Sequence, residues 1–233
     1  MSEWVEVSGP DAAFRAYVAR PAGVVRSAIV VIQEIFGVNA VMRKKADWLA
    51  REGFLAVAPD LFWRLGKDID ITDQSEAEWA QAFDYFKRFD VEAGVRDIQA
   101  TIAQARGMLD SGGAGKVGAV GYCLGGLLAY LTATRADADA SVGYYGVNIP
   151  AFAGEAGKIK KPLMLHIAGK DGFVDKAAQA AMQASLGGNT KITLHTYAEQ
   201  DHAFTREGGK HYDAEAARIA DARTIGFFAT HLG

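Results

Sequence analysis

Short apolar runs recur along the chain, and longer amphipathic stretches separate them. Six of these runs are rich in β-branched residues and have the length of strands that are buried on both faces; they cover residues 28–32, 54–58, 117–120, 141–145, 162–167 and 192–197. A more exposed strand is predicted at residues 14–19.

Between the runs, apolar positions follow the period of a helix. Positions 91, 95, 98, 102, 105 and 109 are apolar at alternating steps of four and three, which places them on one face of a helix. Asn39 can cap a second helix, and Gly53 can end it. An apolar face at Ile225, Phe228 and Leu232 predicts a C-terminal helix. This alternation predicts an α/β fold: a mainly parallel, twisted sheet of about eight strands with helices on both faces.

The uncharged stretch at residues 117–134 approaches the length of a membrane span. Four glycines, Tyr122 and Cys123 interrupt it, and its pattern changes midway from a strand to a helix. We therefore expect a strand, a turn and a helix, and no contact with a membrane.

Composition narrows the class of protein further. The 233 residues are half apolar and carry a formal net charge of −3, so we expect one domain over residues 1–233 and no nucleic-acid partner. The first residues, MSEWVEV, lack a basic region followed by an apolar core, and the one cysteine cannot form an internal disulfide. A cytoplasmic monomer is expected.

The single cysteine lies in GYCLGG at residues 121–126, directly after the apolar run that ends at Val120. The pattern GxCxG is the nucleophile-elbow pattern with sulfur in place of oxygen. Such a turn holds the side chain above the carboxyl end of a sheet, near the N-terminus of the next helix, where a thiolate is favoured. A buried cysteine that acts as a small apolar residue is the alternative.

A thiol nucleophile needs a base and a group that orients the base. His202, in AEQDHAF, follows the strand predicted at residues 192–197, and Asp171, in AGKDGFV, follows the strand at 162–167. Nucleophile, acid and histidine then occur in the chain order of the α/β hydrolases. Asp175 and Asp201 are the competing acids. Glu34 also stands out, because a carboxylate after a buried strand needs a partner or a cleft.

These residues belong to motifs that resemble the dienelactone hydrolases, the carboxymethylenebutenolidases of the α/β-hydrolase fold. The similarity spans nearly the whole chain, and its motifs are QEIFGVNA at 33–40, DVEAG at 90–94, KVGAVGYCLGG at 116–126, VGYYGV at 142–147, GKDGFV at 169–174 and HAFTR at 202–206. The resemblance implies a triad of Cys123, His202 and Asp171, and an oxyanion hole from the backbone N–H groups of Leu124 and Ile35.

The resemblance also implies that Glu34 contacts the resting thiol and helps to generate the thiolate. Arg206 is implied as one of two arginines that bind the substrate carboxylate. The other arginine falls on Trp79 and a supporting tyrosine falls on Phe83, so both polar groups are replaced in this chain. Tyr144 and Phe36 are the remaining candidates for the pocket.

The expected function is hydrolysis of dienelactone-type enol lactones to maleylacetate, in the catabolism of chloroaromatic and other aromatic compounds. Cys123 would form a thioester that water then hydrolyses, with no cofactor and no metal. A general cysteine carboxylesterase for bulkier or uncharged esters is the alternative within enzymes. A ligand-binding scaffold without activity and a redox-sensing cysteine are the alternatives from other classes.

Overall fold

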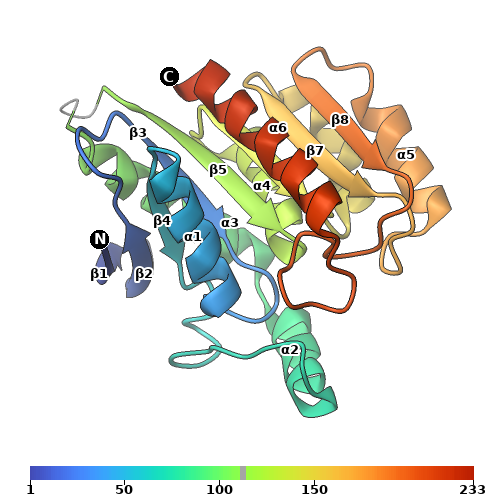
Figure 1. Cartoon of the computed structure of the whole chain (residues 1–233), viewed down its shortest axis with the longest axis horizontal. Coiled ribbons are helices and arrows are strands. Elements are labelled where there is room, and N and C mark those ends of the chain that lie inside the picture. Colours follow the sequence, from blue (N-terminus) through green and yellow to red (C-terminus); the bar gives the residue numbers. More distant parts are fainter. Residues whose placement is uncertain (111–113) are drawn as a thin grey trace.

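The computed structural model describes residues 1–110 and 114–233, and one eight-stranded sheet runs through it (Figure 1). The strands are β1 (Ser2–Ser8), β2 (Ala13–Ala19), β3 (Ser27–Ile32), β4 (Leu55–Pro59), β5 (Lys116–Tyr122), β6 (Ala140–Tyr144), β7 (Leu163–Ala168) and β8 (Ile192–Tyr197). Their order across the sheet is β1-β2-β4-β3-β5-β6-β7-β8. The pairs β1–β2 and β2–β4 are antiparallel and all others are parallel, which confirms the predicted sheet.

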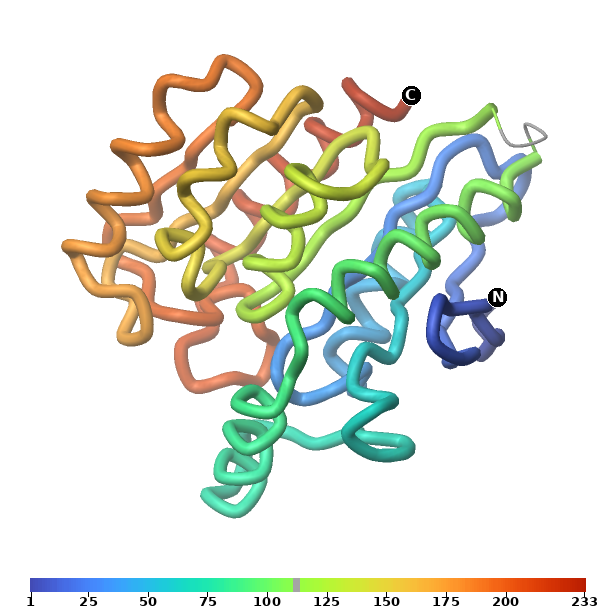
Figure 2. Tube along the Cα trace, turned by 180° about the vertical axis from the view of Figure 1, so that it is seen from behind, coloured from blue at the N-terminus to red at the C-terminus, as the bar shows by residue number. Residues whose placement is uncertain are grey.

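Helices cover both faces of this sheet. They are α1 (Ala40–Arg51), α2 (Glu76–Arg88), α3 (Val91–Gly107), α4 (Leu124–Arg135), α5 (Lys176–Leu186) and α6 (Ala214–Leu232), with a 3₁₀ helix, η1, at Ile149–Lys158. One face carries α1 and α6 (Figure 1), and the opposite face carries α3, α4, η1 and α5 (Figure 2). By contrast, α2 stands off beyond the carboxyl ends of the strands.

The local signals for the first helix act as the sequence predicts. The Asn39 side chain caps α1 by accepting a hydrogen bond of 3.2 Å from the Met42 N–H. Gly53 adopts a left-handed φ of 99° just after the helix, a conformation that is free of strain for glycine alone. The helix predicted from residue 91 ends at Gly107, two residues before the last apolar position of its stripe.

The central strands owe their stability to burial on both faces. Every residue of β3, β4 and β7 is buried, as the continuous apolar runs predict. The uncharged stretch at residues 117–134 forms most of β5 and α4. Among the described residues, no helix is both long and apolar enough to cross a membrane.

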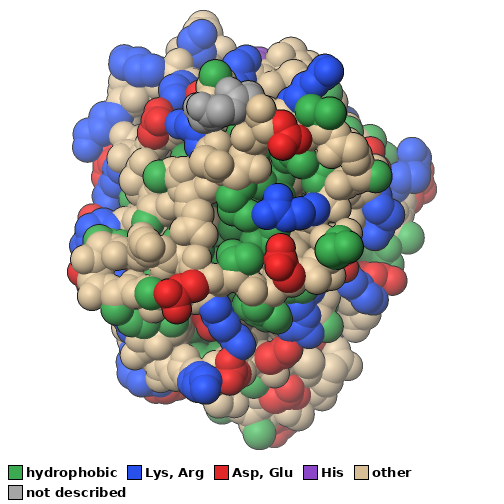
Figure 3. All heavy atoms as spheres, turned by 90° about the vertical axis from the view of Figure 1, so that its left-hand side faces the viewer, with side chains coloured by type: hydrophobic (Ala, Val, Ile, Leu, Met, Phe, Trp, Pro, Cys, Tyr) green, Lys and Arg blue, Asp and Glu red, His purple; other side chains and the backbone are tan. Residues whose placement is uncertain are grey.

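Acidic and basic side chains alternate over the face at the β1–β2 edge, with apolar side chains between them (Figure 3). Arg15 contributes to this mixture, since its guanidinium lies 4.2 Å from the Trp4 ring centroid and pairs with Asp60 and Asp68. This face therefore carries no extended patch of one charge.

Candidate active site

Cys123 lies on a sharp turn between β5 and α4. Its backbone has φ 57° and ψ −113°, a sparsely populated conformation that costs about 1–3 kcal/mol and occurs mainly at functional sites. The neighbouring glycines make the turn feasible: a Cβ on Gly121 would overlap the Gly125 carbonyl, and one on Gly126 would lie 2.6 Å from the Tyr144 carbonyl oxygen. The turn therefore has the form of a nucleophile elbow.

His202 and Asp171 meet at the same edge of the sheet. Asp171 follows β7 and His202 follows β8, and the His202 Nδ1 lies 2.9 Å and 3.1 Å from the two Asp171 carboxylate oxygens. Both side chains are buried, with 4% and 2% of their surface exposed. The carboxylate thus fixes the imidazole ring and its tautomer, with the proton on Nδ1.

The other ring nitrogen of His202 points into the site. Its Nε2 is buried and has no hydrogen-bond partner in the described chain. Burial lowers the pKa of His202, but the negative charges of Cys123 and Asp171 outweigh burial and raise this pKa to about 10. A buried histidine that holds its positive charge beside a sulfur atom favours the thiolate, which is the form of cysteine that acts as a nucleophile.

The two competing acids have other roles. Asp175 caps α5, because its carboxylate accepts a hydrogen bond of 2.8 Å from the Ala178 N–H. Asp201 accepts from the N–H groups of Gly172 and His202 at 3.0 and 2.6 Å. Asp171 is the acid that contacts the imidazole.

The two residues that are predicted to form the oxyanion hole both lie near Cys123. Leu124 is the first residue of α4, and Ile35 follows β3 and lines the same cavity. Within residues 1–110 and 114–233, neither N–H donates to another backbone group. In the same ranges, no group of three or more His, Cys, Asp or Glu side chains could hold a metal ion.

Glu34 is buried at the end of β3, where it is paired with Arg206. The Arg206 Nε and Nη2 donate to the two Glu34 carboxylate oxygens at 2.7 and 3.0 Å. The Arg206 Nη1 also donates to the Asp73 carboxylate at 2.9 Å. No hydrogen bond joins Glu34 and Cys123 in the described chain, because both Glu34 oxygens face the guanidinium.

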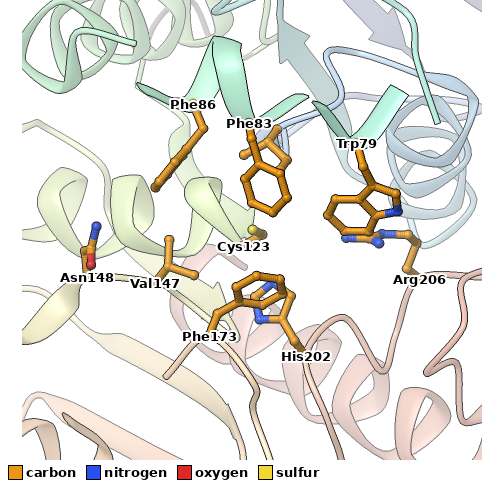
Figure 4. Close-up of a pocket in the computed structure, with 10 residues that line it drawn as sticks. Trp79, Phe83, Phe86, Cys123, Val147, Asn148, Phe173, His202 and Arg206 are labelled. Atoms are coloured by element: carbon orange, nitrogen blue, oxygen red, sulfur yellow. The ribbon is translucent and has the colours of Figure 1, made fainter. Parts of the chain in front are cut away.

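A cavity with a free volume of about 120 Å³ opens above Cys123 (Figure 4). Its lining residues are Ile35, Trp79, Phe83, Phe86, Cys123, Val147, Asn148, Phe173, His202 and Arg206. Phe83 and Phe173 lie on either side of the Cys123 sulfur in this view, with ring centroids 6.3 Å apart. The predicted pocket residues Trp79 and Phe83 thus belong to a mainly aromatic wall.

The structure places Tyr144 outside this cavity, which corrects its assignment as a pocket residue. Side chains alternate along a strand, and Tyr144 points to the opposite side, where its hydroxyl contacts Asp221 and Thr224 of α6 at 3.0 and 2.6 Å. The adjacent Tyr145 packs on His202 instead, with ring centroids 5.1 Å apart.

Phe36 lies one layer behind the cavity wall. Its ring is buried, packs edge-on against Trp79 at 5.2 Å and lies 4.8 Å from the Arg206 guanidinium carbon. Phe36 therefore supports two lining residues and is not a lining residue itself.

Sequence reasoning did not identify several residues of the site. They are Asp73, Phe86, Tyr145, Val147, Asn148 and Phe173. Phe173 could have been predicted as a pocket residue, because it is an aromatic residue in a loop, two positions after the predicted catalytic residue Asp171. No feature of the sequence indicates Asp73, since 133 positions separate it from its partner Arg206.

The parallel sheet and the cysteine elbow with its histidine and acid define an α/β hydrolase. The model of the dienelactone hydrolase family matches residues 14–232, and the chain belongs to this family. A carboxymethylenebutenolidase of Pseudomonas putida is 39% identical over 230 residues, covering 98% of this chain and 97% of the relative. An Azospirillum brasilense protein that is provisionally named a carboxymethylenebutenolidase is 45% identical over 231 residues, covering 97% of each chain.

Solved structures agree with this assignment. A crystal structure from Klebsiella pneumoniae, provisionally named a dienelactone hydrolase, superposes with a TM-score of 0.83 at 25% identity, covering 98% of this chain and 99% of that one. The protein is therefore a hydrolase of the dienelactone hydrolase family.

Proposed function

We propose that this protein opens dienelactone-type enol lactones to maleylacetate through a cysteine thioester, as one step in the catabolism of chloroaromatic and other aromatic compounds. The observation that carries the proposal is the buried His202, which is held by Asp171 and directs a free Nε2 toward the elbow at Cys123. The names of the relatives from Pseudomonas putida and Azospirillum brasilense support the same reaction.

The first step is acylation of Cys123. The sulfur attacks the lactone carbonyl carbon, and the N–H groups of Leu124 and Ile35 bind the oxyanion of the tetrahedral intermediate. Collapse of this intermediate breaks the ring C–O bond and expels the enolate, which takes a proton from the His202 imidazolium. An enolate leaves easily, which suits sulfur, because a thiolate is itself readily expelled.

The second step is hydrolysis of the thioester. His202, now neutral, removes a proton from water, and the resulting hydroxide attacks the thioester carbonyl. Asp171 holds the imidazole in the correct tautomer and stabilises its positive charge. Collapse of the second intermediate releases the acid and restores the Cys123 sulfur.

A second candidate function is hydrolysis of bulkier or uncharged esters by the same chemistry. It is favoured by the wall of Trp79, Phe83, Phe86 and Phe173, which offers apolar contact where the family pattern has an arginine and a tyrosine. Uncharged aryl groups would pack well on such a wall.

The test is a substrate panel that contains dienelactone, uncharged enol lactones and 4-nitrophenyl esters. We expect turnover by the natural protein, and Cys123→Ala should retain less than about a hundredth of it, because the covalent nucleophile is lost. Mass spectrometry of a slowly turned-over ester should show an acyl adduct on Cys123. Comparable activity in the alanine variant would contradict the proposal, and a protein that turns over no member of the panel would favour a binding or redox role.

A further inference from the structure

Arg206, the basic residue that the family pattern assigns to the substrate carboxylate, already binds two carboxylates. Glu34 occupies its Nε–Nη2 edge, and Asp73 accepts from Nη1 at 2.9 Å. All three side chains are nearly inaccessible, with 7% of Arg206, 2% of Glu34 and 9% of Asp73 exposed. Solvent therefore screens this cluster weakly.

The geometry of the guanidinium group leaves few free N–H donors on Arg206 for another anion. A carboxylate binds arginine best through two parallel hydrogen bonds along one edge of the planar group. One edge is taken by Glu34, and Asp73 holds the Nη1 end of the other. A substrate carboxylate can bind this second edge fully only by displacing Asp73.

The net charge of the site also opposes the binding of an anion. Glu34, Asp73 and Arg206 together carry a net charge of −1, from two carboxylates and one guanidinium. Cys123, His202 and Asp171 also sum to −1, whether the shared proton lies on sulfur or on imidazole. An anionic acyl group that enters this cavity is therefore repelled.

We infer that Asp73 is a specificity-determining residue: by neutralising Arg206 it makes the pocket select acyl groups without charge. This inference rests on the proposed cysteine hydrolase chemistry. Of the two candidate substrate classes it favours the uncharged esters over dienelactone, which carries a carboxylate. Asp73 acts through Arg206 and contacts no reacting atom, so it is a positioning residue.

Asp73 also holds part of the aromatic wall. Its backbone carbonyl accepts a hydrogen bond of 3.0 Å from the Trp79 indole N–H. The carboxylate and the carbonyl of one residue thus fix the cation and the indole that together form this side of the cavity. Because Asp73→Asn removes the charge and keeps the carbonyl and the side-chain shape, it tests the electrostatic role separately.

The experiment compares two esters with the same leaving group and a similar acyl shape. The 4-nitrophenyl monoester of fumaric acid carries a carboxylate where 4-nitrophenyl crotonate carries a methyl group. We measure kcat/KM for both esters and take the ratio of the anionic to the neutral ester. Intrinsic differences in reactivity cancel when this ratio is compared between variants.

Asp73→Asn should raise the ratio by about tenfold to a hundredfold, because one negative charge close to the anion is removed. The matched control is Asp70→Asn, which changes an exposed acid of the same loop that pairs with Arg43, and it should leave the ratio unchanged. Asp73→Glu keeps the charge and should give a ratio within about threefold of the natural one. Asp73→Ser replaces Asp73→Asn if that variant does not fold.

Salt provides a measurement that needs no substitution. Salt screens the anion while it approaches through solvent, although the buried cluster itself is screened weakly. If the site repels the anion, added salt should therefore raise kcat/KM for the fumarate ester modestly and leave that for crotonate unchanged. A ratio that Asp73→Asn does not raise, or a fumarate rate that falls with salt, would overturn the inference and leave the hydrolase proposal intact. The hydrolase proposal is tested separately. If Cys123→Ala still hydrolyses both esters, the proposed cysteine mechanism is wrong.

Discussion

Cys123, the residue before the first turn of α4, adopts a conformation that ordinary residues avoid, and its surroundings enforce it. The strain is offset by glycines that let β5, α4 and β6 approach closely. The sulfur then lies at the floor of the cavity, opposite a histidine whose Nε2 has no other partner in the described residues. Strain and an unpartnered buried nitrogen at one place are typical of a reactive centre.

The pH dependence of turnover should report the environment of His202. Burial lowers the pKa of this histidine, and Cys123 and Asp171 raise it to about 10. The imidazolium therefore keeps its proton up to that pH, and kcat/KM for an ester with an alkyl alcohol leaving group should fall above it. Asp171→Asn removes a negative charge that raises the His202 pKa. The fall of kcat/KM at alkaline pH should therefore begin at a lower pH in this variant.

Profiles of kcat/KM between pH 6 and 11 check this, with Asp175→Asn as the control, because that acid caps α5 and does not contact His202. A fall that begins at the same pH in Asp171→Asn would show that the carboxylate does not set the histidine pKa.

Glu34→Gln should destabilise the fold. The substitution leaves the buried Arg206 with Asp73 as its remaining carboxylate, and a hydrogen bond to a charged group contributes about 1.5–3 kcal/mol. We expect a loss of that size in the free energy of unfolding, measured by urea denaturation. Equal stability of the two proteins would contradict a structural role for the Glu34–Arg206 pair.

The sequence predicts some residues of the site and misses others. Cys123, His202 and Asp171 could be placed near one another because each follows a strand, and parallel strands bring their carboxyl ends together. Tyr144 could not, because an error of one position along a strand reverses the face, and Tyr145 is the neighbour of His202. Asp73 could not be predicted, since an ion pair between residues 133 positions apart leaves no periodic pattern in the sequence.

At the scale of elements, the turn from β5 to α4 depends on how closely two backbones approach. A Cβ at Gly125 would lie 2.7 Å from the Gln33 carbonyl oxygen and closer still to that of Ile32. The sheet restrains both carbonyls, because Ile32 is the last residue of β3 and Gln33 follows it directly. We therefore expect Gly125→Ala to prevent folding or to abolish activity.

The matched control is Gly226→Ala in α6. A Cβ there meets nothing within 4 Å, so alanine should stabilise the protein by up to about 1 kcal/mol through its higher helix propensity. Thermal melts of both variants provide the comparison. If Gly125→Ala melted like the natural protein with full activity, the close packing at the elbow would be refuted.

Elements were predictable where burial imposes a strong pattern. The continuous apolar runs predict the bounds of β3 to β8 to within about two residues. They do not predict β1, because nearly all of its residues are exposed or half-buried. The helix α2 escapes for a related reason: of its 13 residues only Ala82 and Tyr85 are buried. Three of its aromatic side chains, Trp79, Phe83 and Phe86, line the cavity and stay partly exposed.

For the whole molecule, this difference in burial predicts uneven stability. Regions with few buried contacts open locally at lower free energy than the core. Amide protons of α2 should therefore exchange faster than those of α3, which buries eight residues of its 17. Hydrogen exchange followed by mass spectrometry measures both helices in one experiment. Equal protection would show that α2 is held as firmly as the core.

The site draws its side chains from segments that are far apart in the chain: Glu34 follows β3, Cys123 follows β5, Asp171 follows β7 and His202 follows β8. A ribosome makes the chain from the N-terminus, so the cysteine emerges long before the histidine that activates it. Throughout synthesis the sulfur is an ordinary thiol with no base beside it. The order of these segments along the chain therefore delays activation of the sulfur until His202 has been made and β8 has joined the sheet.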